Sequence, residues 1–202
     1  MKIIKINPQK PHQDIIDETV ETLRHGGVII YPTDTCYGIG ADMTNIFALE
    51  KIYRIKGREY RKPLSMIIKD IEQLEKYALV ESENKSILSN YLPGPFTFIL
   101  LNINYQILRQ SSIGIRMPDY KITQLIANGL HRPFATTSAN KSGFNPCYSV
   151  SCILNQIEGE KYLPNLILDA GDLPKNPPST VVDLTDNKPR VLRQGGVKFR
   201  SK

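Results

Sequence analysis

Continuous apolar runs separated by amphipathic segments dominate the pattern of this chain. Residues 28–31 and 96–101 are nearly unbroken runs of β-branched, aliphatic and aromatic side chains, which indicates buried strands. In residues 14–24 the apolar side chains recur at helical spacing, and the following Gly26-Gly27 pair predicts the end of that helix. The chain is therefore expected to interleave strands with helices.

Weaker patterns of the same kind extend this prediction along the rest of the chain. Further strands are expected at residues 2–6, 64–68, 113–117, 134–137, 166–169, 180–184 and 190–192. Further helices are expected at residues 45–55, with Thr44 as the cap, and at 71–77, 84–91 and 122–127. Because strands outnumber helices and alternate with them, the pattern predicts a mixed α/β sheet in a single domain over residues 1–202.

Composition restricts the class of protein further. Of the 202 residues, 41% are hydrophobic and 23% are charged, which is the profile of a soluble globular protein and excludes disordered or collagen-like chains. The excess of basic residues gives a net charge of +6, which favours an anionic partner but leaves a nucleotide, RNA and plain solubility all open as its reason.

The sequence also bears on cellular location. No stretch approaches the roughly 18 apolar residues of a membrane span, and residues 1–6 lack the apolar run of a signal peptide. Cys36, Cys147 and Cys152 are odd in number and lack C-x-x-C spacing, so neither a disulfide framework nor a zinc site is expected. We therefore expect a cytoplasmic protein with no membrane partner.

The densest candidate chemistry lies at the end of the helix expected at residues 45–55. Lys56, Gly57 and Arg58 follow that helix, and Lys62 comes four residues later. Lysine offers a compact charge and arginine a planar fork, and both suit phosphate oxygens. The alternative is a solvated helix end, where cations complement the negative end of the helix dipole.

Three polar loops adjoin predicted strands, at residues 33–37, 138–142 and 177–180. Loops at strand ends are where α/β sheets bind ligands, and these offer hydroxyl and amide groups but no evident base or nucleophile. Arg116 stands within an apolar strand, which indicates a charged partner. The three histidines are scattered, so a histidine metal site is not expected.

Together these pieces resemble the YrdC/Sua5 family of threonylcarbamoyl-adenylate synthases. The resemblance covers roughly residues 10 to 196 in the family's order. The matching segments are Tyr31-Pro32-Thr33-Asp34-Thr35 with Tyr37-Gly38, Lys56-Gly57-Arg58 with Lys62-Pro63-Leu64, Leu92-Pro93-Gly94-Pro95-Phe96-Thr97, Ile115-Arg116-Met117-Pro118, Ser138-Ala139-Asn140, and Pro178-Ser179-Thr180-Val181-Val182-Asp183.

The resemblance implies a strongly twisted open α/β sheet with a basic concave cleft. The reaction it implies joins L-threonine, bicarbonate or CO₂, and ATP into threonylcarbamoyl-AMP and pyrophosphate. A companion threonylcarbamoyl-transferase complex then uses this product to modify adenosine 37 of tRNA. Mg²⁺ is expected to arrive with ATP, bound through phosphate and water, so no protein-held metal is predicted.

The resemblance also implies roles for single residues. Lys56 and Arg58 match the basic pair at the ATP phosphates and are the expected catalytic residues. The remaining expected ATP contacts are Lys62, Ser112, Thr136, Ser138, Asn140 and Arg193. The expected threonine contacts are Thr35, Arg116 and Ser179. Two positions depart from the pattern: Ile67 replaces a histidine of some members, and Pro146 replaces a serine.

Other functions stay open at this level. A basic twisted sheet could instead clamp double-stranded RNA or tRNA, which predicts steep salt dependence and little need for threonine. A same-fold paralogue could act on another carbamoyl or nucleotide substrate, as in the carbamoyl-transfer modules of hydrogenase maturation. The hydroxyl and amide loops favour a small ligand and therefore the enzyme.

Overall fold

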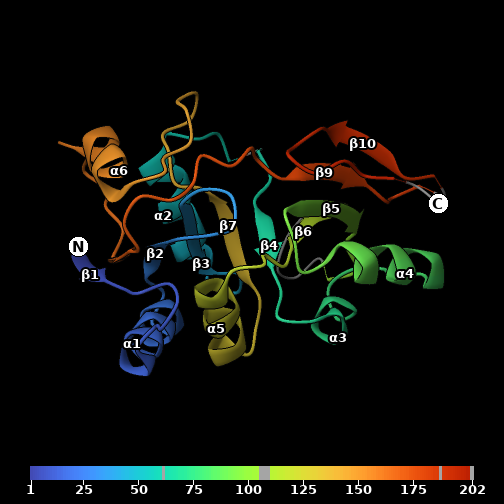
Figure 1. The fold of residues 1–202 in the computed structure, drawn as a ribbon, viewed down its shortest axis with the longest axis horizontal. Helices are drawn as coiled ribbons and strands as arrows, with labels where there is room; N and C mark the ends of the chain where they lie inside the picture. The colour runs from blue at the N-terminus through green and yellow to red at the C-terminus, as the bar shows by residue number, and fades with distance from the viewer. Residues whose placement is uncertain (61, 105–109, 187, 201–202) are drawn as a thin grey trace.

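The computed structural model describes residues 1–60, 62–104, 110–186 and 188–200. In these residues ten strands form one open sheet in the order β1-β8-β2-β3-β7-β4-β6-β5-β9-β10 (Figure 1). The strands are β1 (Lys2–Lys5), β2 (Val28–Tyr31), β3 (Gly38–Asp42), β4 (Ser65–Ile67), β5 (Phe96–Leu101), β6 (Ser112–Arg116), β7 (Phe134–Ser138), β8 (Leu166–Asp169), β9 (Thr180–Asp183) and β10 (Arg190–Arg193). The helices are α1 (Gln13–Arg24), α2 (Ile46–Lys56), α3 (Ile71–Leu74), α4 (Ser82–Tyr91), α5 (Lys121–Leu130) and α6 (Val150–Ile157).

The predicted mixed α/β class is confirmed, and each expected strand is present within a residue or two of its predicted bounds. Three details of the prediction were wrong. Asn45, and not Thr44, caps α2, because its side chain accepts a hydrogen bond from the amide of Ala48. The third helix is one turn long, and two elements, β3 and α6, had not been predicted.

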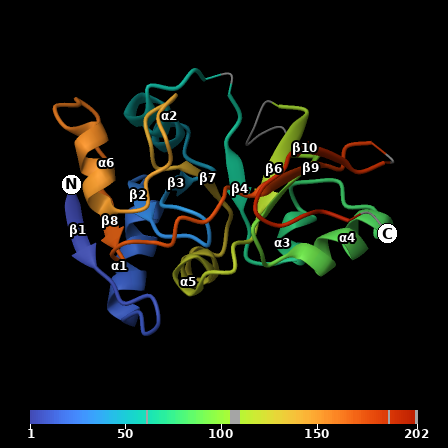
Figure 2. The same ribbon diagram turned by 45° about the horizontal axis from the view of Figure 1, so that its top comes forward.

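The sheet carries a hydrophobic core on each face. Helices α1 and α5 lie side by side on one face and bury Ile16, Leu23 and Ile126 against the sheet (Figure 2). The other core is larger and takes in buried side chains of α2, α4 and α6. Burial on both faces explains why the central strands read as continuous apolar runs.

Residues 170–179 connect β8 to β9 and cross the middle of the molecule; we call this segment the strap (Figure 2). β8 and β9 are separated by six strands in the sheet order. Seven strand spacings measure about 34 Å along the sheet, while the connection reaches about 36–40 Å when fully extended. The strap therefore runs extended, and Pro174, Pro177 and Pro178 favour that conformation.

A disulfide between Cys147 and Cys152 corrects the prediction drawn from cysteine spacing. Cys147 is fully buried in the loop before α6, and Cys152 lies in the first turn of that helix. The unpredicted helix brings the two α-carbons to 5.6 Å, a separation that a disulfide can bridge. Cys36 stays a free thiol.

Candidate functional site

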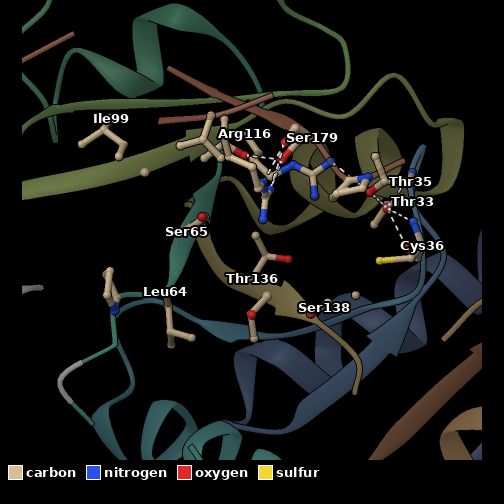
Figure 3. Close-up of a pocket in the computed structure, with 18 of the residues that line it drawn as sticks. Thr33, Thr35, Cys36, Leu64, Ser65, Ile99, Arg116, Thr136, Ser138 and Ser179 are labelled. Carbon is tan, nitrogen blue, oxygen red and sulfur yellow. Dashed lines mark hydrogen bonds between the residues drawn. The ribbon is translucent and has the colours of Figure 1, made fainter. Parts of the chain in front are cut away.

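A cavity of about 850 Å³ opens above the middle of the sheet (Figure 3). Arg116 and Ser179 lie on one side of it, Thr136 and Ser138 on the opposite side, and Thr33, Thr35 and Cys36 close one end. Hydroxyl groups line much of its wall: Thr33, Thr35, Ser65, Thr97, Ser111, Ser112, Thr136, Thr137, Ser138 and Ser179.

The charged groups on this wall are all positive. The guanidinium groups of Arg58, Arg116 and Arg193 line the cavity, and no carboxylate does so among the described residues. Hydroxyl groups can donate to anionic oxygens, and guanidinium groups bind carboxylate and phosphate through paired hydrogen bonds. The cavity is therefore suited to a ligand that carries several negative oxygens.

Eight of the eleven predicted site residues line this single cavity. They are Thr35, Arg58, Ser112, Arg116, Thr136, Ser138, Ser179 and Arg193. They come from segments up to 158 residues apart in the sequence. The sheet brings them together because β7, β4, β6, β5 and β9 are consecutive strands in the sheet order. Pro146 also lines the cavity, whereas Ile67 is buried at a smaller, separate pocket.

Arg116 has a charged partner within the protein, as its place in an apolar strand indicates. Its Nη2 atom donates to Asp34 Oδ1 at 2.8 Å and to Thr35 Oγ1 at 3.4 Å. The side chains of Arg116 and Asp34 are 13% and 10% exposed. Asp34 was not among the predicted site residues, although it stands inside the matched motif.

The hydroxyl group of Thr33 holds the turn that carries Asp34. Thr33 Oγ1 donates to the carbonyl of Cys36 at 2.6 Å and accepts from the amides of Thr35 and Cys36. The strap holds the turn from outside, because Asn176 Nδ2 donates to the carbonyl of Asp34 at 3.0 Å. The turn is thus fixed from two sides.

Arg193 positions Ser179. Its Nε and Nη2 atoms donate to the Ser179 carbonyl at 3.2 and 2.9 Å, and Nη2 also reaches Ser179 Oγ at 3.1 Å. Thr97 Oγ1 lies 2.9 Å from the same hydroxyl oxygen. Burial and the nearby Arg116 charge lower the pKa of Arg193.

Lys56 is buried, so the reading of a solvated helix end was wrong for this residue. It is 3% exposed, and its Nζ atom donates to the carbonyls of Ser138 and Asn140 at 2.5 and 2.6 Å. Burial, together with the Arg58 charge, lowers its pKa to about 8. Lys56 does not line the cavity and instead holds the loop that begins at Ser138.

Two further predicted residues also lie outside the cavity wall. Lys62 is half exposed and its ammonium group lies 4.0 Å from Glu59. Asn140 donates from Nδ2 to the carbonyls of Lys141 and Phe144, and its buried Oδ1 atom has no partner among the described residues. Asn140 thus shapes its own loop.

Neither a metal cluster nor a membrane helix marks the described part of the chain. No group of three histidine, cysteine or acidic residues there could hold a metal ion. In the same residues, no helix is long and apolar enough to cross a bilayer.

Several known proteins share this sequence pattern. The model of the Sua5/YciO/YrdC family, described as "Telomere recombination", matches residues 21–195. A relative from Methanocaldococcus jannaschii, whose name describes it provisionally as a threonylcarbamoyl-AMP synthase, is 34% identical over 99% of this chain and 94% of its own. The uncharacterised YciO protein of Escherichia coli K12 is 33% identical over 94% and 93% of the two chains.

Solved structures agree with these matches. Sua5 of P. abyssi, solved as a complex with L-threonine, superposes with a TM-score of 0.88 at 30% identity. The match covers 97% of this chain but 58% of Sua5, so the chain spans little more than half of that relative. E. coli YciO superposes with a TM-score of 0.85 at 32% identity and covers 96% of both chains. The chain therefore belongs to the Sua5/YciO/YrdC family.

Proposed function

We propose that this protein is an L-threonylcarbamoyl-AMP synthase, a nucleotidyltransferase that acts on L-threonine, bicarbonate or CO₂, and ATP. The observation that carries the proposal is the cavity wall, where three guanidinium groups stand among hydroxyl groups without a carboxylate. Such a wall suits a carboxylate and a triphosphate together. A Sua5 protein that superposes on 97% of this chain binds L-threonine, which supports the amino acid as substrate.

The proposed reaction has two steps. In the first, the ammonium form of threonine and bicarbonate give the carbamate, one water molecule and one proton. In the second, a carbamate oxygen attacks the α-phosphorus of ATP, the bond from that phosphorus to its bridging oxygen breaks, and pyrophosphate leaves. Both reactants of the second step are anions, so cations that screen them lower the barrier.

The wall residues divide between the two ligands in this proposal. Arg116 binds the threonine carboxylate, with the hydroxyls of Thr35 and Ser179 beside it. Arg58 and Arg193 face the phosphates. Ser112, Thr136 and Ser138 are the proposed nucleotide contacts.

Three predicted ATP residues that do not line the wall are proposed to act indirectly. Lys56 and Asn140 hold the loop that begins at Ser138. Lys62 is half exposed on the segment that follows Arg58 in the sequence, and its proposed role is to add positive charge near the cavity. Mg²⁺ would come bound to ATP, and the proposed product would serve a companion transferase that acts on tRNA.

A paralogue with a changed substrate is the second candidate. The observation that favours it is the match to E. coli YciO, an uncharacterised protein that this chain resembles as closely as it resembles Sua5 and over a larger share of the relative's length. Such a paralogue would use the same cavity with another carbamate or nucleotide.

Pyrophosphate release from purified protein tests the proposal. The complete mixture holds ATP, Mg²⁺, bicarbonate and L-threonine, and each component is omitted in turn. Release that requires both threonine and bicarbonate supports the synthase. Release that is unchanged without either one refutes it, and release that requires another amino acid or nucleotide favours the paralogue.

A further inference from the structure

The Asp34–Arg116 pair has one donor and one acceptor left over. A hydrogen bond joins Asp34 Oδ1 to Arg116 Nη2 at 2.8 Å, and the two side chains are about nine-tenths buried. Asp34 Oδ2 and Arg116 Nε are also buried, and neither has a hydrogen-bond partner among the described residues. Buried polar atoms usually have partners, because leaving them without one destabilises the fold.

The two atoms call for opposite kinds of ligand group. Arg116 Nε needs an acceptor and carries positive charge, whereas Asp34 Oδ2 needs a donor and carries negative charge. A zwitterion supplies both, and the α-carboxylate and α-ammonium groups of an amino acid lie a short distance apart. The pair therefore has the charge pattern of an amino-acid receptor.

Charge balance strengthens this reading. Arg116 already donates from Nη2 to Asp34 Oδ1, so a ligand carboxylate that binds the remaining guanidinium donors lies close to the Asp34 carboxylate. Two carboxylates would then share one guanidinium group in a largely buried site, which is unfavourable. Asn176 holds the carbonyl of Asp34, and Thr33 holds the amide of the next residue, so a large retreat of Asp34 into solvent is opposed. A ligand ammonium group restores the balance.

We propose that Asp34 is a positioning and specificity residue for the amino-acid substrate. In the empty cavity it holds Arg116 in place, and on binding its Oδ2 atom accepts from the ligand's α-ammonium group while Arg116 binds the ligand's carboxylate. Asp34 thereby selects amino acids over carboxylic acids that lack the amino group. This inference rests on the proposed function, because it names the group that recognises that substrate.

A bracing role would have a different signature. If Asp34 only orients Arg116, then Asp34→Asn keeps an oxygen at the same place and changes the affinity for every carboxylate by a similar factor. If Asp34 reads the ammonium group, the same substitution weakens amino acids selectively. The ratio of two affinities therefore separates the two roles.

Calorimetry with two probes measures this ratio. The probes are L-threonine and 2,3-dihydroxybutanoate, in which a hydroxyl group replaces the α-amino group. We expect Asp34→Asn to weaken threonine at least about tenfold, the scale for losing a buried charge partner, and to leave the hydroxy acid unchanged or tighter. Asp34→Glu should retain part of the preference. The matched control Asp172→Asn changes an exposed carboxylate of the strap and should leave both affinities unchanged.

The outcomes distinguish this inference from the proposed function. Equal changes for both probes, or none, with ATP binding intact, overturn the role of Asp34 and leave the synthase proposal standing. If Asp34→Asn does not fold, Asp34→Glu decides: a preference for threonine that is smaller than in the wild type supports the role, and equal weakening of both probes overturns it. Binding of another L-amino acid but not threonine by the wild type overturns the proposed substrate, and the ratio is then measured with that amino acid. Binding of no amino acid overturns both.

Discussion

Replacing Lys56 by methionine and by arginine tests what a buried ammonium group does beside the cavity. Its two hydrogen bonds hold the carbonyls of Ser138 and Asn140, and its pKa is lowered from 10.5 to about 8, chiefly by burial. This difference means that folding favours the neutral amine by about 3 kcal/mol relative to water. The charged form nevertheless prevails at neutral pH.

The sign of the pH effect follows from this lowered pKa. Between pH 8 and 10.5 the unfolded chain holds a proton that the folded chain has released, so the free energy of unfolding rises with pH. From about pH 7.5 to 9.5 this gain amounts to about 2 kcal/mol. Lys56→Met lacks the titrating group, and Lys56→Arg stays charged throughout, so neither variant should show the gain.

Urea denaturation of the three proteins at both pH values measures this gain. All three proteins contain the same tyrosines, so any effect of tyrosine ionisation on the free energy of unfolding cancels in the difference between wild type and Lys56→Met. That difference should change by about 2 kcal/mol. Equal pH slopes in the three proteins would refute the reasoning. Turnover adds a second measurement, because deprotonation weakens the hold on the loop. Pyrophosphate release by wild type relative to Lys56→Arg should therefore fall as pH rises through about 8.

Three further predictions concern other parts of the site and its surroundings. Arg58→Ala should lower the rate of pyrophosphate release by about 10²- to 10³-fold, whereas Lys188→Ala, an exposed cation away from the cavity, should not. The double variant Ser138→Ala/Asn140→Ala should raise the KM for ATP several-fold; a large fall in Tm with unchanged KM would show that the loop is only structural. Reduction of the Cys147–Cys152 disulfide should lower the free energy of unfolding by about 2 kcal/mol, given its five-residue separation, which urea titrations with and without dithiothreitol can measure.

The strands that could be predicted are those in which burial shows directly as an apolar run. Val28–Tyr31 and Phe96–Leu101 lie inside the sheet and were predicted at their observed bounds. β3 was missed because two of its five residues are glycines, which usually indicate a turn. In the structure Gly40 serves close packing, since a Cβ atom there would lie 2.7 Å from the carbonyl oxygen of Ala135.

The residues of the site also fall into those that the sequence could predict and those that it could not. Loops at strand ends could be predicted to meet, and Thr35, Ser138 and Ser179 do line one cavity. The pairing of Asp34 with Arg116 joins residues 82 positions apart, and no local pattern in one sequence reports such a contact. The burial of Lys56 was also missed, because a cation at a helix end is ordinarily solvated.

The strap has a consequence for the order in which the protein can assemble during synthesis. It delivers β9 to β5, so Thr180 pairs with Phe96 across 84 positions of sequence. Ser179 and Arg193 stand at and beyond the end of the strap, and together with Val181 they follow all other residues of the cavity wall in the chain. A chain growing on the ribosome can pair β2, β3, β7, β4, β6 and β5 long before these two residues emerge. Contacts between such distant residues form slowly, so completion of the cavity should be a late event in folding.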